Sequence, residues 1–249
     1  MIAKKYRSAE MLAITVFHCM LIMPFFISPL LRLSFMLCSD DQSIYTISCM
    51  QPLFHYYSVY KPFQVLSQFS SEEGKKTLGD FFRVEKEVYP VGRLDHDSEG
   101  LLLLTDDKAI NHRLLHPRWE HEREYWVQVE GAIEEKALYA LEKGVVISVN
   151  GKQYKTKPCK ARRLSATLPM PERNPPIRFR QSIPTSWISL VLSEGKNRQV
   201  RKMTAAVGFP TLRLIRYRIG RLTIEGFAPG EMREWKRDAF YKLLFDKQG

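Results

Sequence analysis

Residues 89 to 107 read Tyr-Pro-Val-Gly-Arg-Leu-Asp-His-Asp-Ser-Glu-Gly-Leu-Leu-Leu-Leu-Thr-Asp-Asp, and this stretch decides the fold. Four leucines run without alternation between Gly100 and Asp106. Such a run is typical of a strand that is covered on both faces, although a short buried helix has the same pattern. We expect a buried strand that places the preceding residues, Asp95 to Glu99, at one edge of the core, and we call these residues the acidic loop.

Asp95 is the main candidate for a functional residue in this loop. It follows the apolar Leu94 and comes shortly before the leucine run. A carboxylate held at the mouth of a buried strand is costly unless it is paired or takes part in chemistry. A hairpin turn with solvated acidic side chains is the simplest alternative interpretation.

A calcium loop is a second alternative, because five residues match positions 1, 3, 5, 6 and 12 of that motif: Asp95, Asp97, Glu99, Gly100 and Asp106. The flanking sequence argues against it. An EF-hand requires a helix before the loop, whereas Pro90 and its β-branched and aromatic neighbours favour a strand. Position 12 is normally a bidentate Glu and is the shorter Asp106 here. We therefore predict no metal site.

Composition limits the possible partners. The chain has 249 residues, a net charge of +11 and a pI near 9.5. This length suits one domain with or without a small appendage. The basic excess predicts a polyanionic partner, either nucleic acid or an anionic membrane surface. The four cysteines show neither metal-site spacing nor a disulfide framework, which fits a reducing cytoplasm.

Residues 1–49 differ from the rest of the chain. The run from residue 11 to residue 37 is almost wholly apolar but contains two prolines and an arginine, which would disrupt a spanning helix. Three interpretations stay open: a segment outside the functional protein with Met50 as the true start, a membrane anchor, or a packed extension. We expect the first, with residues 50–249 forming the functional domain and no membrane partner.

The central stretch resembles a family signature. Gly92-Arg93-Leu94-Asp95, followed after four residues by Gly100-Leu-Leu-Leu-Leu-Thr105, is similar to the signature of the pseudouridine synthases, in the branch that includes RsuA, RluB, RluE and RluF. In that family the aspartate is the catalytic nucleophile, and the match places it at Asp95. The resemblance implies an α+β fold, with a mixed, mainly antiparallel sheet, flanking helices and a central catalytic cleft.

Three further motifs extend the resemblance. Lys61-Pro62 is similar to the family's first motif, which shapes the cleft behind the catalytic loop. Residues 123–127 resemble a Lys-x-Tyr-x-Val strand that carries a catalytic-site tyrosine, here Tyr125, with Arg in place of the Lys. Gln-Val-Arg at residues 199–201 resembles the segment whose basic residue pairs with the nucleophile, which implies this role for Arg201.

The segment between Asn197 and Gly208 is predicted as a helix, with Asn197 as N-cap and Gly208 just past its end. Its apolar residues form one stripe, and Arg198 and Lys202 lie off that stripe. Positive charge near a helix N-terminus is unfavourable against the helix dipole, so we expect an anionic partner here.

Two basic runs, residues 155–163 and 173–180, lie close to Tyr154 and Phe179. Cations for phosphates and aromatic rings for bases are the two components of binding to unpaired RNA. The second run, together with residues 183–187, resembles the RluE branch most. We expect no S4-type RNA-binding domain before the catalytic region. The candidate RNA-binding residues are Arg93, Lys61, Arg173, Arg178, Arg198 and Lys202.

The resemblance implies isomerisation of a specific uridine in 23S ribosomal RNA to pseudouridine. A uridine inside folded RNA must be flipped out to reach a buried carboxylate. Arg93 is implied to replace or steady the flipped base, Tyr125 to lie against the base or sugar, and Arg201 to hold Asp95.

Bond rearrangement without redox or metal chemistry requires no cofactor. Three mechanisms stay open: attack of Asp95 at C1′, attack at C6, and a glycal route. The position of the uridine also stays open, as does the substrate, which is either free RNA or an assembling large subunit. We expect a cytoplasmic monomer. A non-catalytic RNA-binding or ribosome-assembly protein on the same scaffold is the alternative.

Overall fold

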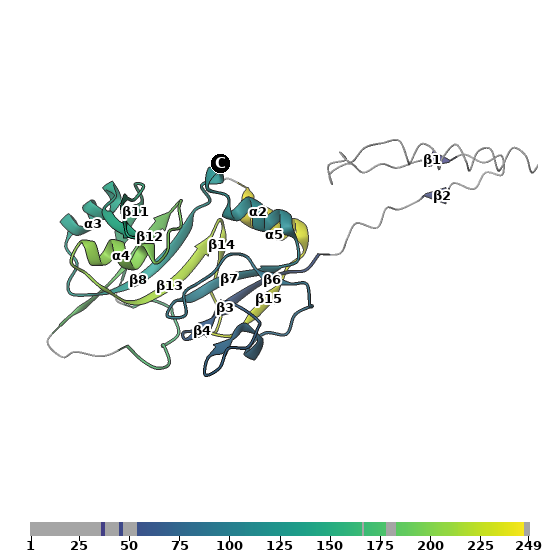
Figure 1. Ribbon diagram of the computed structural model, residues 1–249, viewed down its shortest axis with the longest axis horizontal. Coiled ribbons are helices and arrows are strands. Elements are labelled where there is room, and N and C mark those ends of the chain that lie inside the picture. The colour runs from purple at the N-terminus through teal and green to yellow at the C-terminus, as the bar shows by residue number, and fades with distance from the viewer. Residues whose placement is uncertain (1–35, 38–44, 47–53, 166, 178–182, 247–249) are drawn as a thin grey trace, which may run out of the picture. The chain divides into compact units, whose positions relative to one another are not determined.

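The leucine run lies at the centre of a β-sheet in the computed structural model of the chain (Figure 1). It forms strand β7 (Glu99–Thr105), in which every residue is buried. Leu101 and Leu103 belong to a core cluster with residues of helices α2 (Lys108–Leu115) and α5 (Arg237–Phe245). Leu102 and Leu104 belong to a separate cluster. The run lacks alternation because both faces of the strand are covered, and the predicted strand is confirmed.

The structure describes residues 54–165, 167–177 and 183–246, together with two short strands of the N-terminal region. The chain divides into two compact units, Met1–Pro52 and Leu53–Gly249. In the first unit, β1 (Met36–Leu37) pairs with β2 (Tyr45–Thr46) in antiparallel orientation. The apolar run up to residue 35 and Met50 lie outside the described residues.

The second unit is built on a mixed, mainly antiparallel sheet, which confirms the predicted α+β class. Strands β7 and β13 are parallel, and the other pairs in this sheet are antiparallel. Within the described residues its order is β11 (Lys160–Arg163), β12 (Thr185–Leu192), β8 (Arg123–Glu130), β13 (Thr211–Ile219), β7, β3 (Tyr56–Lys61) and β15 (Met232–Glu234), with β6 (Tyr89–Pro90) beside β7 and β14 (Leu222–Thr223) beside β13.

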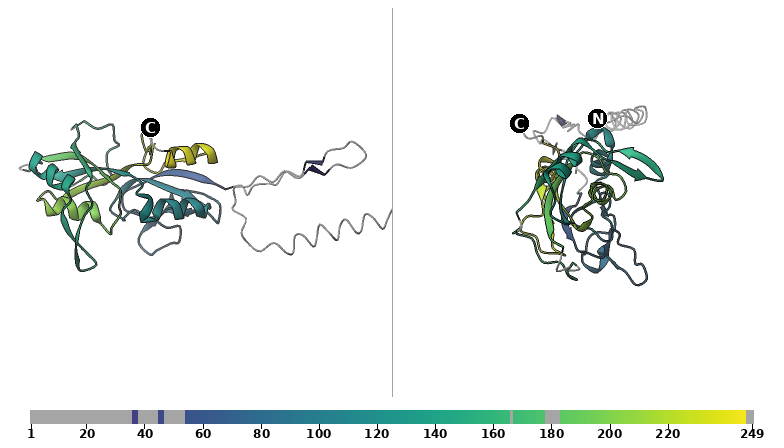
Figure 2. Two further views of the ribbon diagram at one scale, coloured as in Figure 1. Left: turned by 90° about the horizontal axis from the view of Figure 1, so that it is seen from above. Right: turned by 90° about the vertical axis from the view of Figure 1, so that its left-hand side faces the viewer.

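Smaller elements surround this sheet. The helices gather at its two ends, with α3 and α4 near β11 and β12, and α2 and α5 near β3 and β6 (Figure 2). No helix within residues 54–246 that the structure describes has the length and apolar content to cross a bilayer. The remaining elements are β4 (Val65–Leu66), β5 (Lys76–Thr77), β9 (Val146–Val149), β10 (Lys152–Lys155), α3 (Glu135–Lys143), α4 (Gln199–Ala206) and the 3-10 turns η1 (Leu78–Asp80) and η2 (Pro117–Trp119).

Strand β8 has its main core contacts on one face, a point that its alternating sequence left undecided. Val127 and Val129 pack into a cluster with α3 and α4, and Tyr125 lies at the edge of that cluster. On the opposite face Trp126 stacks on Tyr217, with ring centroids 3.9 Å apart. The face of β8 that carries Tyr125, Val127 and Val129 is therefore packed against α3 and α4. Near the start of the strand, at Tyr125, the same face lines a pocket.

Gly100 permits the close approach of β7 and β13. It pairs with Arg216 in the parallel register and has a φ of 104°, which is strained for any residue with a side chain. A Cβ at this position would lie 2.4 Å from the Arg216 carbonyl oxygen. The glycine of the signature thus fixes β13 against the end of the acidic loop and brings Arg216 to the pocket.

Candidate active site

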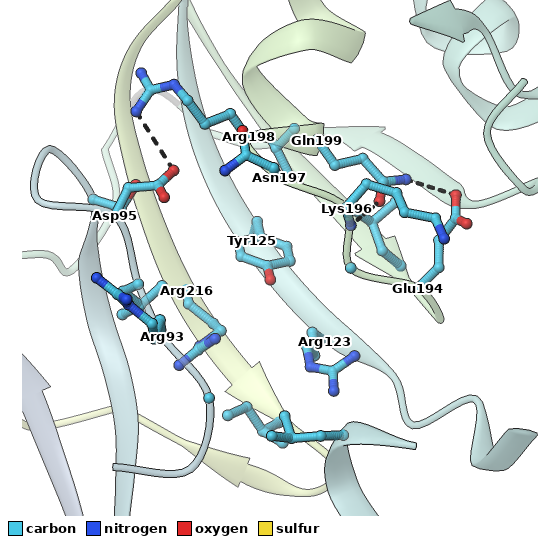
Figure 3. Close-up of a pocket in the computed structure, with 18 of the residues that line it drawn as sticks. Arg93, Asp95, Arg123, Tyr125, Glu194, Lys196, Asn197, Arg198, Gln199 and Arg216 are labelled. Carbon is cyan, nitrogen blue, oxygen red and sulfur yellow. Dashed lines mark hydrogen bonds and ion pairs between the residues drawn. The ribbon is translucent and has the colours of Figure 1, made fainter. Parts of the chain in front are cut away.

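A pocket of about 790 Å³ opens between the acidic loop, strand β8 and the segment before α4 (Figure 3). Binding sites for small molecules commonly enclose roughly 300–1,000 Å³, so one nucleotide fits. Basic residues outnumber acidic ones two to one in the lining, which favours an anionic ligand. The basic residues are Arg93, Arg123, Lys157, Lys196, Arg198 and Arg216, and the acidic ones are Asp95, Glu120 and Glu194.

Asp95 is held on a fixed backbone with its carboxylate accessible. The amide of the preceding Leu94 donates to Ser67 Oγ at 3.0 Å, and this hydroxyl donates to the Leu94 carbonyl at 2.8 Å. The Ser98 amide donates to the Asp95 carbonyl at 3.0 Å and closes the turn. The Asp95 side chain retains 36% exposure. A preorganised carboxylate facing a basic pocket suits nucleophilic chemistry.

Arg198 is the cation nearest to Asp95 among the ion pairs of the described residues. Its Nη1 lies 3.6 Å from Asp95 Oδ2, and its two Nη atoms donate to the carboxylate oxygens of Asp97 at 3.0 and 2.8 Å. Partial burial raises the pKa of Asp97, but the Arg198 hydrogen bonds and the charges of Arg201 and Arg198 outweigh burial and hold this pKa below its usual value. Arg198 therefore joins the two carboxylates.

The predicted pairing of Arg201 with Asp95 is not formed. Arg201 Nη2 instead donates to the Asp97 carbonyl oxygen at 2.6 Å and lies 3.4 Å from Asp97 Oδ2. The reason is the start of the helix: α4 begins at Gln199, and Arg198, not Asn197, is its N-cap. Arg198 has φ 52° and ψ 33°, a left-handed conformation that is rare outside glycine, and its side chain points to the acidic loop.

Tyr125 and Arg216 lie side by side in the pocket (Figure 3). They are register partners on β8 and β13, and directly opposed residues of antiparallel strands project from the same face. Arg216 Nε donates to the Leu101 carbonyl at 2.7 Å, whereas its buried Nη2 has no acceptor among the described residues. Burial lowers the pKa of Arg216. An unpaired buried guanidinium N–H is costly, so Arg216 is ready to bind a ligand oxygen.

Arg216 is a site residue that the sequence did not identify. The alternation of apolar and basic residues in 211–219 indicates only a strand with a charged face. Its pairing with Gly100 is the informative signal, and that pairing is visible only once the two strands are known to be neighbours.

Lys61 is buried, so its predicted direct contact with RNA is wrong. Its Nζ donates to the carbonyls of Val65 at 2.7 Å and Pro62 at 3.0 Å. Burial lowers the pKa of Lys61 to about 7, although nearby carboxylates, Glu99 above all, oppose this shift. The turn that Lys61 stabilises also supports the acidic loop, because the Gln64 amide donates to the His96 carbonyl at 2.9 Å.

The other candidate RNA-binding residues fall into different environments. Arg93 is exposed at the pocket, and Lys202 lies half-buried on α4 away from the lining. Arg173 donates to the carbonyls of Pro175 and Pro176 and lies 4.1 Å from the ring centroid of Phe63. Its guanidinium therefore has structural partners. Arg178 lies outside the described residues.

Glu194 fixes the wall of the pocket opposite Asp95. It accepts hydrogen bonds from the Tyr154 hydroxyl, from the Lys157 amide at 2.9 Å and from Gln199 Nε2 at 2.7 Å. These contacts connect the end of the β9–β10 hairpin to the start of α4. The segment that carries Arg198 is thus anchored on both sides.

The residues of the calcium pattern do not share a centre. Asp97 pairs with Arg198, Glu99 forms a bidentate pair with Arg213 at 2.9 and 2.8 Å, and Asp106 accepts from the His55 amide at 2.8 Å. Within residues 54–165, 167–177 and 183–246, no three His, Cys, Asp or Glu side chains are grouped as a metal site. These carboxylates serve separate ion pairs and hydrogen bonds.

Comparison with known proteins agrees with this geometry. The family model for RNA pseudouridylate synthase matches residues 55–206. Ribosomal large subunit pseudouridine synthase E of Vibrio vulnificus (strain CMCP6) is 49% identical over 174 residues, which make up 70% of this chain and 72% of that protein. Ribosomal large subunit pseudouridine synthase B of Bacillus subtilis (strain 168) is 36% identical over 180 residues, or 72% of this chain and 67% of that protein.

The fold leads to the same family. A crystal structure of a pseudouridylate synthase aligns with a TM-score of 0.62 at 27% sequence identity, covering 84% of this chain and 83% of that one. The chain therefore belongs to the RNA pseudouridylate synthase family, as its signature from Gly92 to Thr105 predicts.

Proposed function

We propose that this enzyme converts a specific uridine of large-subunit (23S) ribosomal RNA to pseudouridine, with Asp95 as the nucleophile. The observation that carries the proposal is the accessible Asp95 carboxylate in a basic pocket, 3.6 Å from Arg198 and in the same lining as Tyr125. The relatives named for large-subunit pseudouridine synthases supply the substrate class.

The reaction is an isomerisation in which all atoms are retained. The bond between N1 of uracil and C1′ of ribose breaks, a bond between C5 and C1′ forms, C5 loses a proton and N1 gains one. Asp95 acts by attack at C1′, by attack at C6, or by assisting a glycal route. In each case Arg198 orients the carboxylate and balances its charge.

The other pocket residues hold the nucleotide. A uridine must leave its helix to reach Asp95. Arg93 at the rim replaces or steadies the flipped base, and its exposed guanidinium neutralises one phosphate beside it. Tyr125 lies against the base or sugar, and the free Nη2 of Arg216 binds an oxygen of the nucleotide. Arg201 is a positioning residue, because it holds Asp97 and thereby Arg198.

Backbone phosphates of the RNA are bound outside the pocket. Lys202 on α4 and the basic residues 155–163 supply charge for these contacts, which are electrostatic and independent of sequence. Arg178 is assigned to the same phosphate-binding set. Arg173, which donates to backbone carbonyls, is assigned instead to the support of its own loop.

The catalytic domain in this proposal is residues 50–249, acting as a monomer in the cytoplasm, with residues 1–49 outside the functional domain. All residues assigned to the pocket come after Met50. A chain that starts at Met50 should therefore retain full activity and solubility. Loss of either on truncation would instead favour the packed extension, and partition of the full chain with membranes would favour the anchor.

Asp95→Asn tests the central assignment. Tritium at C5 of uridine is released when C5 bonds to C1′, so release from labelled 23S ribosomal RNA measures the reaction. Asp95→Asn should abolish release and retain RNA binding. Asp106→Asn is a matched control, because it removes a carboxylate at the other end of β7 and should leave the rate within about twofold, well under 1 kcal/mol in the barrier.

The outcomes separate the alternatives. A wild-type rate of tritium release in Asp95→Asn would refute the assignment of Asp95 as the nucleophile. Binding of RNA by the wild-type protein without any release would favour a non-catalytic RNA-binding or assembly protein.

A further inference from the structure

Trp119 is an exposed aromatic residue at the edge of the pocket. It ends η2, which joins α2 to β8, and its indole retains 43% exposure. The residues on either side of this turn line the pocket: Leu115, His116, Glu120 and His121. Trp119 itself is not in the lining. It therefore lies on the rim, where RNA on either side of a flipped uridine would pass.

The surroundings of Trp119 are cationic. The guanidinium carbon of Arg118 lies 4.5 Å from its ring centroid, and that of Arg113 lies 5.9 Å from it. Arg113 also lies 3.9 Å from the ring centroid of Phe245 on α5. An exposed indole beside two guanidinium groups combines a stacking surface with charge for phosphate.

The turn that carries Trp119 is fixed on two sides. Arg113 connects it to α5 through the ring of Phe245. On the other side Glu120 pairs with Lys157, which follows β10. Glu122 pairs with Lys160 of β11 at 3.0 Å. The indole is thus presented on a supported turn, which lowers the entropic cost of binding.

The other exposed aromatic residues in the part of the chain that the structure describes lack this combination. Tyr139 on α3 is 61% exposed and has a cation, Lys143, 5.2 Å from its ring centroid. Neither Tyr139 nor any residue within four positions of it lines the pocket. Tyr139 is therefore a matched control for exposure and charge without proximity to the site.

We propose that Trp119 and Arg118 form a platform for single-stranded RNA next to the target uridine, with a base stacked on the indole and the adjacent phosphate bound by Arg118. This inference rests on the proposed function and adds the residues that hold the neighbouring nucleotides. Unpaired bases are commonly recognised by stacking on aromatic rings and guanidinium planes. The basic pocket lining extends the same charge from the rim to Asp95.

Steady-state kinetics on C5-tritiated 23S ribosomal RNA test the platform. Trp119→Ala should raise KM by about 5- to 150-fold, which corresponds to the roughly 1–3 kcal/mol of one base–aromatic stack, and change kcat by less than about twofold. Trp119→Phe should recover most of the loss, because a ring remains. Tyr139→Ala should leave both constants within about twofold of wild type. Equal KM values for Trp119→Ala and Tyr139→Ala would overturn the proposal.

Binding experiments separate this inference from the proposed function. Oligouridylate should quench the tryptophan fluorescence of the wild-type protein, and Trp119→Phe should lose that quenching while it still binds. Arg118→Gln should lower the slope of log affinity against log salt by about 0.7, the value for one phosphate contact on a single strand.

Failure of the platform and failure of the proposed function then give different results. Quenching that depends on Trp119 in a protein that releases no tritium would leave the platform standing and refute the proposed function. Tritium release with quenching that persists in Trp119→Phe would refute the platform alone.

Discussion

Two arginine–carboxylate pairs, whose acidic residues lie two positions apart in the chain, have similar geometry and opposite environments. Glu99 and Arg213 form two hydrogen bonds of 2.9 and 2.8 Å, and Asp97 and Arg198 form two of 3.0 and 2.8 Å. The first pair is almost sealed, with side-chain exposures of 3% and 7%. The second is open, with exposures of 36% and 43%. Geometry alone therefore does not tell a structural pair from a functional one.

The difference follows from position along the chain. Glu99 is the first residue of β7, where β13 and the core clusters exclude water. Asp97 lies two residues earlier, before the strand is covered, and faces Arg198 at the pocket. A sealed pair cannot change partners without a large desolvation penalty, whereas an open pair can release its arginine toward a ligand. We therefore assign stability to Glu99–Arg213 and function to Asp97–Arg198.

Breaking the sealed pair should produce the largest effect on stability. Arg213→Met leaves the Glu99 carboxylate buried without its cation, and removal of one partner from a buried pair typically costs roughly 3–5 kcal/mol. Urea unfolding of the variant measures this loss. The double variant Glu99→Met with Arg213→Met should recover much of it, because no lone charge remains. A single-variant loss under about 1 kcal/mol would show that the pair is not sealed in solution.

Lys61 extends the comparison to a buried cation that forms no salt bridge with any residue the structure describes. Its pKa is about 7 in the folded protein, against the ordinary value of 10.5 for an exposed lysine, so the unfolded chain binds more protons between these pH values. Stability therefore rises with pH in this window, by at most about 1.4 kcal/mol per pH unit. Urea unfolding from about pH 7 to 9.5 should show a rise that Lys61→Met lacks. Parallel curves for the two proteins would contradict the buried, neutralised lysine.

The open pair should affect activity more than stability. Arg198→Gln should change the free energy of unfolding by no more than about 1 kcal/mol, as is usual for exposed pairs. Tritium release should fall roughly tenfold or more, because Asp95 loses its nearest cation. Arg198→Lys should recover only part of the lost tritium release, because an ammonium group cannot form the two parallel hydrogen bonds that a guanidinium group forms with a carboxylate.

Arg201→Gln is the matched comparison for Arg198. It removes a contact to Asp97 but none to Asp95, so its activity should lie between those of wild type and Arg198→Gln. A larger loss in Arg201→Gln than in Arg198→Gln would restore Arg201 as the direct partner of the nucleophile.

The sequence predicted the parts of the fold that depend on local pattern. The leucine run predicts a buried strand because two covered faces require apolar residues throughout. The signature also places Asp95 in the acidic loop, and the structure shows that loop at the pocket. The partner of Asp95 could not be predicted, because it depends on one left-handed residue, Arg198, whose backbone conformation no periodicity reveals.

Buried polar residues explain the other differences. Lysine is usually an exposed residue, so the sequence predicts Lys61 at the surface. Only its hydrogen bonds to the carbonyls of Pro62 and Val65 show how its side-chain nitrogen is accommodated inside the protein. Arg216 belongs to an alternating strand in which every arginine looks equivalent by sequence. Long-range strand order, which brings it opposite Gly100 and Tyr125, decides which arginine reaches the pocket.

The smallest expected effect is on the salt dependence of RNA binding. It should differ between an exposed arginine and an arginine that is hydrogen-bonded to the backbone. Arg93 is exposed at the pocket, whereas Arg173 donates to three backbone carbonyls, those of Pro175, Pro176 and Leu212. Counterion release makes the affinity for single-stranded RNA fall with salt by about 0.7 in the logarithmic slope for each phosphate bound. Arg93→Gln should therefore lower the slope by about one contact, and Arg173→Gln should leave it unchanged while destabilising its loop. Fluorescence titrations with oligouridylate at several salt concentrations give both slopes. An equal reduction in the two variants would place Arg173 on the RNA despite its carbonyl partners, and burial and hydrogen bonding would then no longer separate binding arginines from structural ones.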